Sequence, residues 1–234
     1  MAEAKLIAHR GAEIVTRDQL KAYVTPSATD TFKPVGHYLL VETLTQVMQD
    51  RGLFIAREQF AVQKERLFGT FDLEWQKMDE YGAAVGFRHA NDKSMPITIA
   101  VGARVFVCDN MSMLGELITV RKHTAKLDLA EELDRTMFRY MQGWRKLKDD
   151  IQIQQEAEIE ERRAKQLIYD IFRQKVLPLK LFHPVVEGYE LATRDQKGTG
   201  WLLHNACTAP LKTLAPAPAF RATARLGKFF AAKF

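Results

Sequence analysis

The chain has 234 residues, of which 47% are hydrophobic and 27% charged, so it can bury one sizeable core and is not expected to be disordered. Its net charge of +5 favours an anionic partner. The two cysteines, the polar opening of the chain and the lack of about 18 consecutive apolar residues predict a reduced cytoplasmic protein without a membrane span.

Two helices are predicted before any strand. Thr16 and Gln19 stand three residues apart in the form of a capping box, which indicates a short helix ending near Tyr23. Apolar residues recur at three- and four-residue spacing between Gly36 and Arg51, and glycine follows directly, so the second helix ends there.

The spacing of apolar residues then changes to two, which is typical of β-strands. Five strands are predicted, at residues 53–62, 66–75, 82–89, 97–108 and 117–121. Short connections between consecutive strands favour an antiparallel meander of four to five strands. The fold class is therefore α+β, with the sheet covered by the helix that follows.

Residues 127–177 contain no proline and read as a long helix, whose apolar stripe from Leu129 to Leu147 would cover one sheet face. A run of this length exceeds most helices, so we expect a break near Gly143 or at 149–150. One helix with a projecting polar arm at 149–165 and a hairpin of two helices both remain open.

The C-terminal third predicts shorter helices near 185–193 and 201–214, then an Ala-Pro linker at 215–218. Residues 220–234 combine four cations with four phenylalanines and no acid, which indicates a detachable basic aromatic tail. The predicted organisation is an N-terminal segment at 1–34, one α+β domain at 35–214 with a helical C-terminal region, and the tail at 215–234.

Polar clusters follow three predicted strands, at residues 88–94, 108–110 and 121–124. The segments Gly86–Arg88, Asp92–Ser94, Gly102–Asn110 and Arg121–Thr124 resemble the phage- and plasmid-borne family catalogued as domain of unknown function 932, as do, less specifically, the helix at 36–51 and the stretch at 201–208. The resemblance covers roughly residues 35–214. It implies a mobile-element origin, in a bacterial host cell, and a shared fold, but no activity. Where that family has a histidine before its Asp-Lys pair, this chain has Asn91, with His89 nearby.

An enzymatic interpretation uses the strand ends. His89, Asp92, Asp109 and His123 have the types of side chain that ligate a divalent metal, and Lys93 could steady a scissile phosphate. Turn formation and a plain ion pair explain the same residues. No phosphate loop, nucleophile elbow or zinc-protease motif is present, and no cofactor is predicted. Three further histidines have no companions at ligand spacing: His37, His183 and His204.

A binding interpretation uses cations and aromatic rings. Arg88 and Arg104 would lie on strands and Lys93, Arg121 and Lys122 at their rim, as a basic track for phosphates. Phe68 and Phe106 share the phase of neighbouring arginines, so their rings could stack on unpaired bases or else form a second core. The tail adds Arg221, Arg225 and Lys228.

The sequence therefore predicts a non-enzymatic protein that binds single-stranded nucleic acid as a homo-oligomer, in recombination, replication or DNA protection. The order of helix, meander and long helix is similar to the core of single-strand annealing proteins that form rings or filaments. Two alternatives are a protein-binding inhibitor of host defence, of the anti-restriction or anti-CRISPR type, and a metal-dependent nuclease.

Overall fold

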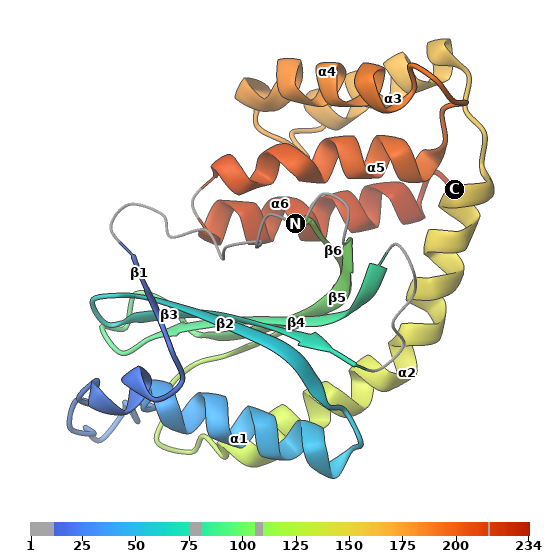
Figure 1. The fold of residues 1–234 in the computed structure, drawn as a ribbon. Helices are drawn as coiled ribbons and strands as arrows, with labels where there is room; N and C mark the ends of the chain where they lie inside the picture. Colours follow the sequence, from blue (N-terminus) through green and yellow to red (C-terminus); the bar gives the residue numbers. More distant parts are fainter. Residues whose placement is uncertain (1–11, 75–80, 106–109, 215) are drawn as a thin grey trace. The chain divides into compact units, whose positions relative to one another are not determined.

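The computed structural model describes residues 12–74, 81–105, 110–214 and 216–234 (Figure 1). Within these ranges the protein has one six-stranded antiparallel sheet and six α-helices, which confirms the predicted α+β class. The strands are β1 (Glu13–Val15), β2 (Ile55–Gln63), β3 (Arg66–Leu73), β4 (Tyr81–Ala90), β5 (Ile97–Val105) and β6 (Asn110–Arg121). The α-helices are α1 (His37–Asp50), α2 (Leu129–Glu156), α3 (Glu161–Arg173), α4 (Phe182–Ala192), α5 (Gly200–Thr208) and α6 (Pro216–Ala231), with short 3-10 turns at Gln19–Ala22, Leu179–Leu181 and Ala209–Thr213.

The sheet is a meander, because its strands lie side by side in chain order from β1 to β6. The five predicted strands correspond to β2–β6. The sixth, β1, pairs with β2 over three residues and is too short for a period of two to be recognised. Along β3 the predicted alternation is confirmed, with Leu67, Gly69, Phe71 and Leu73 buried and the residues between them half-buried.

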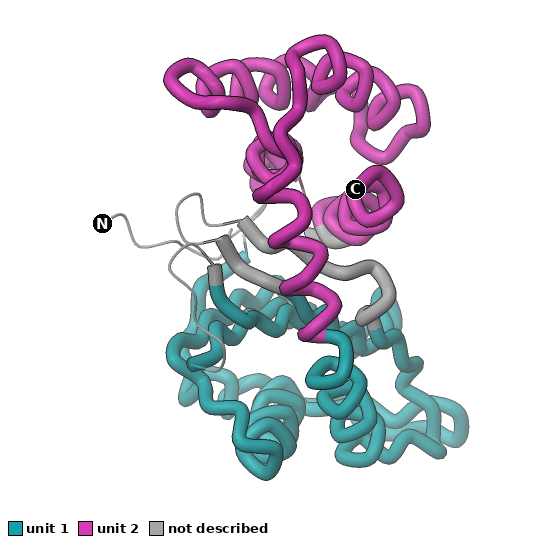
Figure 2. The backbone as a smooth tube through the Cα atoms, turned by 90° about the vertical axis from the view of Figure 1, so that its right-hand side faces the viewer, with its two compact units in different colours: residues 1–102, 117–143 teal, residues 103–116, 144–234 magenta. Residues whose placement is uncertain are grey.

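The chain divides into two compact units (Figure 2). Unit 1 comprises residues 1–102 and 117–143, and unit 2 comprises residues 103–116 and 144–234. The expected boundaries at residues 34 and 214 do not coincide with these units.

The core of unit 1 lies between the sheet and α1. Phe60, Phe71 and Phe87 come from three adjacent strands, with ring centroids 5.0 to 6.2 Å apart. Leu40 and Leu44 of α1 are also fully buried. Figure 1 shows α1 and the first part of α2 on the same sheet face. The unit-1 part of α2 therefore covers the sheet as predicted.

The start of the 3-10 turn at Gln19–Ala22 and the end of α1 follow the local signals in the sequence. The capping box at Thr16 is formed, because its backbone N–H donates to Gln19 Oε1 at 2.7 Å and its hydroxyl accepts from the Gln19 N–H at 3.3 Å. Helix α1 ends where Gly52 takes a φ of 71°, and the Leu53 N–H bonds the Met48 carbonyl at 2.9 Å. This is a Schellman motif, which favours glycine at the left-handed position.

The predicted helix at 127–177 is two helices, and the expected positions of the break are wrong. Helix α2 runs through Gly143 and residues 149–150 and ends at Glu156. The chain turns at 157–160 because its backbone pairs with a distant segment of unit 2. The Ile159 N–H donates to the Gly198 carbonyl at 2.9 Å, and the Gly200 N–H donates to the Ala157 carbonyl at 3.0 Å. A pairing across some 40 residues leaves no trace in local periodicity.

The expected linker and detachable tail form helix α6. Pro216 and Pro218 occupy its first turn, where a missing N–H costs no hydrogen bond. Further along the helix Leu226, Phe229 and Phe230 are buried in the core of unit 2, together with residues of α3, α4 and α5. The tail is therefore part of the core.

We expect Gly69→Ala to destabilise the protein by about 1–3 kcal/mol, because a Cβ at this position would lie 2.2 Å from the Phe87 ring on the paired strand. Urea unfolding of the variant measures this loss. Gly188→Ala in α4 is the matched control, since its Cβ would meet nothing nearer than 3.8 Å. That variant should gain roughly 0.5–1 kcal/mol from alanine's helix propensity. Equal effects of the two substitutions would contradict this account of Gly69.

Candidate nucleic-acid interface

Three histidines from distant parts of unit 1 form a buried cluster. His37 at the start of α1 and His89 of β4 share a hydrogen bond, with 2.9 Å between His37 Nδ1 and His89 Nε2. The His123 ring, just beyond β6, stacks on the His89 ring at 5.4 Å. All three side chains are buried. Burial lowers the pKa of His37 to about 4 and the pKa of His89 well below its usual value, so the cluster is uncharged at neutral pH.

The predicted metal ligands come together only in part. His89 and His123 are neighbours, and His37 joins them, although the sequence offered it no partner. The Asp92 carboxylate instead accepts a hydrogen bond from the Ser94 N–H at 2.9 Å and lies 3.4 Å from the Arg66 guanidinium. Asp109 lies outside the described residues. Among the residues that the structure describes, no three His, Cys, Asp or Glu side chains are arranged to hold a metal ion.

The described side chains of unit 1 do not all lie open to solvent as the predicted basic track would require. Arg88 is half-buried, with its Nε and Nη1 atoms shielded from solvent, and Phe68 is half-buried rather than exposed. Arg121 is bound to Glu132 at 2.5 Å. Two of the predicted cations remain on the surface. Lys122 is exposed, and the exposed Lys93 places its ammonium group 5.0 Å from the centre of the Phe32 ring. The Arg104 side chain and Phe106 lie outside the described residues.

The predicted cations of the tail lie along one side of α6. Arg221, Arg225 and Lys228 follow one another at four- and three-residue spacing, which places them on one helix face, and all three are exposed. The opposite side carries the buried Leu226 and Phe230. No described carboxylate lies within ion-pair distance of these three cations. Their charges are therefore available to an external anion.

A fourth cation adjoins this row. The Arg225 guanidinium donates a hydrogen bond to the Lys175 carbonyl at 3.3 Å, and the Lys175 side chain is exposed. Lys175 ends α3 in a Schellman motif with a φ of 55°, an uncommon conformation for a residue other than glycine. We call Lys175, Arg221, Arg225 and Lys228 the α6 basic face. Lys175 was not among the predicted site residues, because no sequence pattern relates it to a helix 50 residues away.

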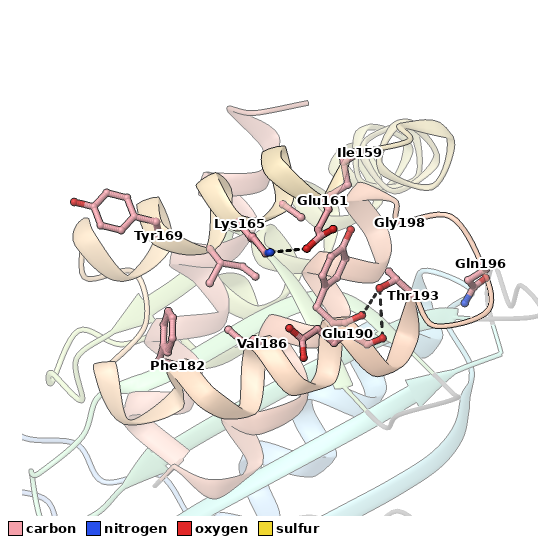
Figure 3. Close-up of a pocket in the computed structure, with 13 residues that line it drawn as sticks. Ile159, Glu161, Lys165, Tyr169, Phe182, Val186, Glu190, Thr193, Gln196 and Gly198 are labelled. Carbon is pink, nitrogen blue, oxygen red and sulfur yellow. Dashed lines mark hydrogen bonds and ion pairs between the residues drawn. The ribbon is translucent and has the colours of Figure 1, made fainter.

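A groove lies between α3 and α4 in the same unit (Figure 3). Its volume is about 580 Å³. Ile168, Phe182 and Val186 make part of its lining apolar. Lys165 lies at its edge, bound to Glu161 at 2.5 Å, and Tyr169 is 62% exposed. None of these residues was a predicted site residue. The one available signal in the sequence was that Tyr169 and Arg162, seven positions apart, place a ring and a cation on one helix face.

Comparison with protein-family models, with curated proteins and with solved structures found no match. The resemblance to domain of unknown function 932 therefore stays a prediction. No helix in the described part of the chain is long and apolar enough to cross a membrane.

We expect the protein to lose stability between pH 7 and pH 5 because of its buried histidines. In the folded state the pKa of His37 is about 4, against about 6.5 when unfolded, so the unfolded chain binds the proton more tightly. The stabilisation is complete above pH 6.5 and falls as the pH drops toward 4. At pH 5 the loss from this group alone is about 2 kcal/mol. Urea unfolding at the two pH values measures it.

The variant His37→Gln should show a pH dependence smaller than that of the wild type by about this amount. His183→Gln is the control, because His183 is exposed, and its pH dependence should match the wild type. An unchanged pH dependence in His37→Gln would rule out the buried cluster as the cause.

Removal of residues 216–234 should unfold unit 2 rather than merely detach a binding segment. The deletion would remove Leu226, Phe229 and Phe230 from the core, and each such large side chain contributes about 3 kcal/mol or more. The loss would appear as rapid amide hydrogen exchange in α3–α5. The control is the triple variant Arg221→Gln/Arg225→Gln/Lys228→Gln, which changes exposed side chains, removes one surface hydrogen bond from Arg225 to Lys175 and should keep wild-type protection. Native protection after the deletion would show that the tail is dispensable for folding.

Proposed function

We propose that the protein binds single-stranded nucleic acid without catalysing a reaction, and that the α6 basic face holds the phosphates. The observation that supports this proposal is the row of Arg221, Arg225 and Lys228, which are exposed and have no carboxylate partner among the described residues. Of the four described cations predicted in unit 1, Arg121 is bound to Glu132 and Arg88 is half-buried, so two, Lys93 and Lys122, stay exposed there. Unit 2 therefore offers the stronger positive field to an anionic ligand.

The geometry of the row suits a polyanion. Seven residues of α-helix rise about 10.5 Å, and a stacked nucleic-acid strand carries one phosphate for about every 3.4 Å. The row thus spans about three phosphates. Because the other side of α6 is buried in the core, the row is rigid and needs little ordering on binding.

An exposed ring in the same unit favours a single strand over a duplex. Tyr169 is 62% exposed on α3, the helix that ends at the Arg225–Lys175 contact. Unpaired bases stack on such rings regardless of their sequence, whereas the bases of a duplex do not present their faces. In the cell we place this activity in recombination, replication or DNA protection by a phage or plasmid, with the protein acting as a homo-oligomer in the bacterial cytoplasm.

The test is a fluorescence-anisotropy titration of a labelled single-stranded oligonucleotide and its matched duplex over a salt series. The wild type should prefer the single strand and weaken as salt rises. The variant Arg221→Gln/Arg225→Gln/Lys228→Gln should bind more weakly by on the order of tenfold or more. Its salt slope should be lower by about two, since each lost phosphate contact contributes about 0.7.

The matched control is Lys93→Gln/Arg121→Gln/Lys122→Gln, which removes three of the cations that sequence analysis placed at the strand ends. It should bind with nearly wild-type affinity. A strong loss in this control with none in the α6 variant would move the interface to unit 1. Absence of binding at low salt would overturn the proposal, and the acidic surface of a host protein would become the partner to seek.

A further inference from the structure

We propose that the groove between α3 and α4 receives an unpaired nucleobase that carries an exocyclic amino group, as adenine, cytosine and guanine do. This inference rests on the proposed function, because the base would belong to the strand held by the α6 basic face. It adds a site to that function and predicts which bases the protein prefers.

The groove has the size of a small-ligand site. One row of its lining residues is Glu161, Lys165 and Ile168 on α3, and the facing row is Phe182, Val186 and Glu190 on α4 (Figure 3). The eight helical steps from Phe182 to Glu190 give it a length of about 12 Å. Its volume of about 580 Å³ lies within the range of sites for small molecules.

One end of the groove offers aromatic surface. Phe182 lines it and is held in place by Phe172, whose ring meets it at 5.2 Å and an angle of 71°. Tyr169 lines the groove from α3 and leaves most of its ring exposed. A planar base can cover either ring face, and such stacking contributes about 1–3 kcal/mol per base.

The other end offers hydrogen-bonding groups that the protein itself does not use. Tyr189 is 7% exposed, and its hydroxyl group has no hydrogen-bond partner among the described residues. A Cβ at residue 198 would lie 2.1 Å from that hydroxyl oxygen, so the hydroxyl group packs directly against Gly198. Tyr189 lines the groove, so a ligand there can bond to its hydroxyl group.

Glu190 decides which bases fit. Its carboxylate is exposed at the groove and attracts the Lys165 ammonium group, which is hydrogen-bonded to Glu161. A carboxylate can only accept hydrogen bonds, so it favours a base with an amino group over thymine or uracil, which have none. The Tyr189 hydroxyl can donate to a ring nitrogen or carbonyl of the same base.

The groove is within reach of the strand on the α6 basic face. The Arg225 guanidinium bonds the Lys175 carbonyl, and Tyr169 precedes Lys175 by six residues. That separation corresponds to about 9 Å along a helix. A strand whose phosphate contacts Arg225 can therefore place a neighbouring base on the Tyr169 ring.

The first experiment compares Tyr169→Leu with Tyr169→Phe in the anisotropy titration of a single-stranded oligodeoxycytidylate. The leucine variant should bind roughly 5- to 150-fold more weakly with an unchanged salt slope, because it loses stacking and no phosphate contact. The phenylalanine variant keeps the ring and should bind as the wild type does. The exposure of Tyr169 makes both substitutions compatible with folding.

The second experiment measures Glu190→Gln with oligodeoxycytidylate and oligodeoxythymidylate of equal length. The wild type should prefer cytosine, and the variant should lose part of that preference while its affinity for thymine stays within about twofold, since one amino–carboxylate contact discriminates by up to roughly tenfold.

The outcomes separate the two proposals. If the wild type binds oligonucleotides and Tyr169→Leu binds equally well, the groove is not the base site, while the α6 basic face stands. If Tyr169→Leu changes the sedimentation of the protein and not its affinity, the groove is a contact between copies of the chain, which also overturns the inference. If the wild type binds no oligonucleotide, both proposals fail.

Discussion

Burial of the apolar side of α6 is the constraint on which the rest of unit 2 depends. Phe230 is enclosed and stacks on the His204 ring, with centroids 4.3 Å apart and planes 4° from parallel. His204 is held in turn by Gln154 of α2, because its Nδ1–H donates a 2.8 Å hydrogen bond to Gln154 Oε1. These contacts fix the rotation of α6 about its axis. Arg221, Arg225 and Lys228 lie on the opposite side of the helix and must then face solvent. Packing of the core therefore creates the basic face.

In unit 1, by contrast, several arginines are paired with carboxylates of the same unit. Arg17 connects the N-terminal segment to the rest of the unit by binding Glu42 at 2.9 Å and also Glu58, and its guanidinium lies 5.9 Å from the centre of the Phe71 ring. Arg51 binds Asp134 and joins α1 to α2. Such pairs hold elements together and leave little charge for a ligand. In unit 2, by contrast, Arg221, Arg225 and Lys228 are exposed and have no carboxylate partner among the described residues.

Local signals in the chain were sufficient for the elements whose cause is local. The alternation along β3 reflects one buried and one less buried face, and Gly52 stops α1 because few other residues adopt its φ of 71°. The break after Glu156 could not be predicted, since its cause is a backbone pairing with Gly198. The same holds for His37 and His89, which bond across 52 residues, and for Lys175, which joins Arg225 across 50. Only the fold brings such pairs together.

By itself the sequence determined the fold class, the order of the strands and the surplus of cations near the C-terminus. These properties follow from composition and from the spacing of apolar residues, with a period of two in strands and 3.6 in helices. A short segment is enough to show either period. The tertiary structure decided which of the predicted cations are available. Arg88 is half-buried, and Arg121 is paired with Glu132. Arg221, Arg225 and Lys228 are exposed on a helix whose opposite side is buried. Whether a charged side chain is bound, buried or exposed depends on neighbours from distant parts of the chain, and its own segment does not contain that information.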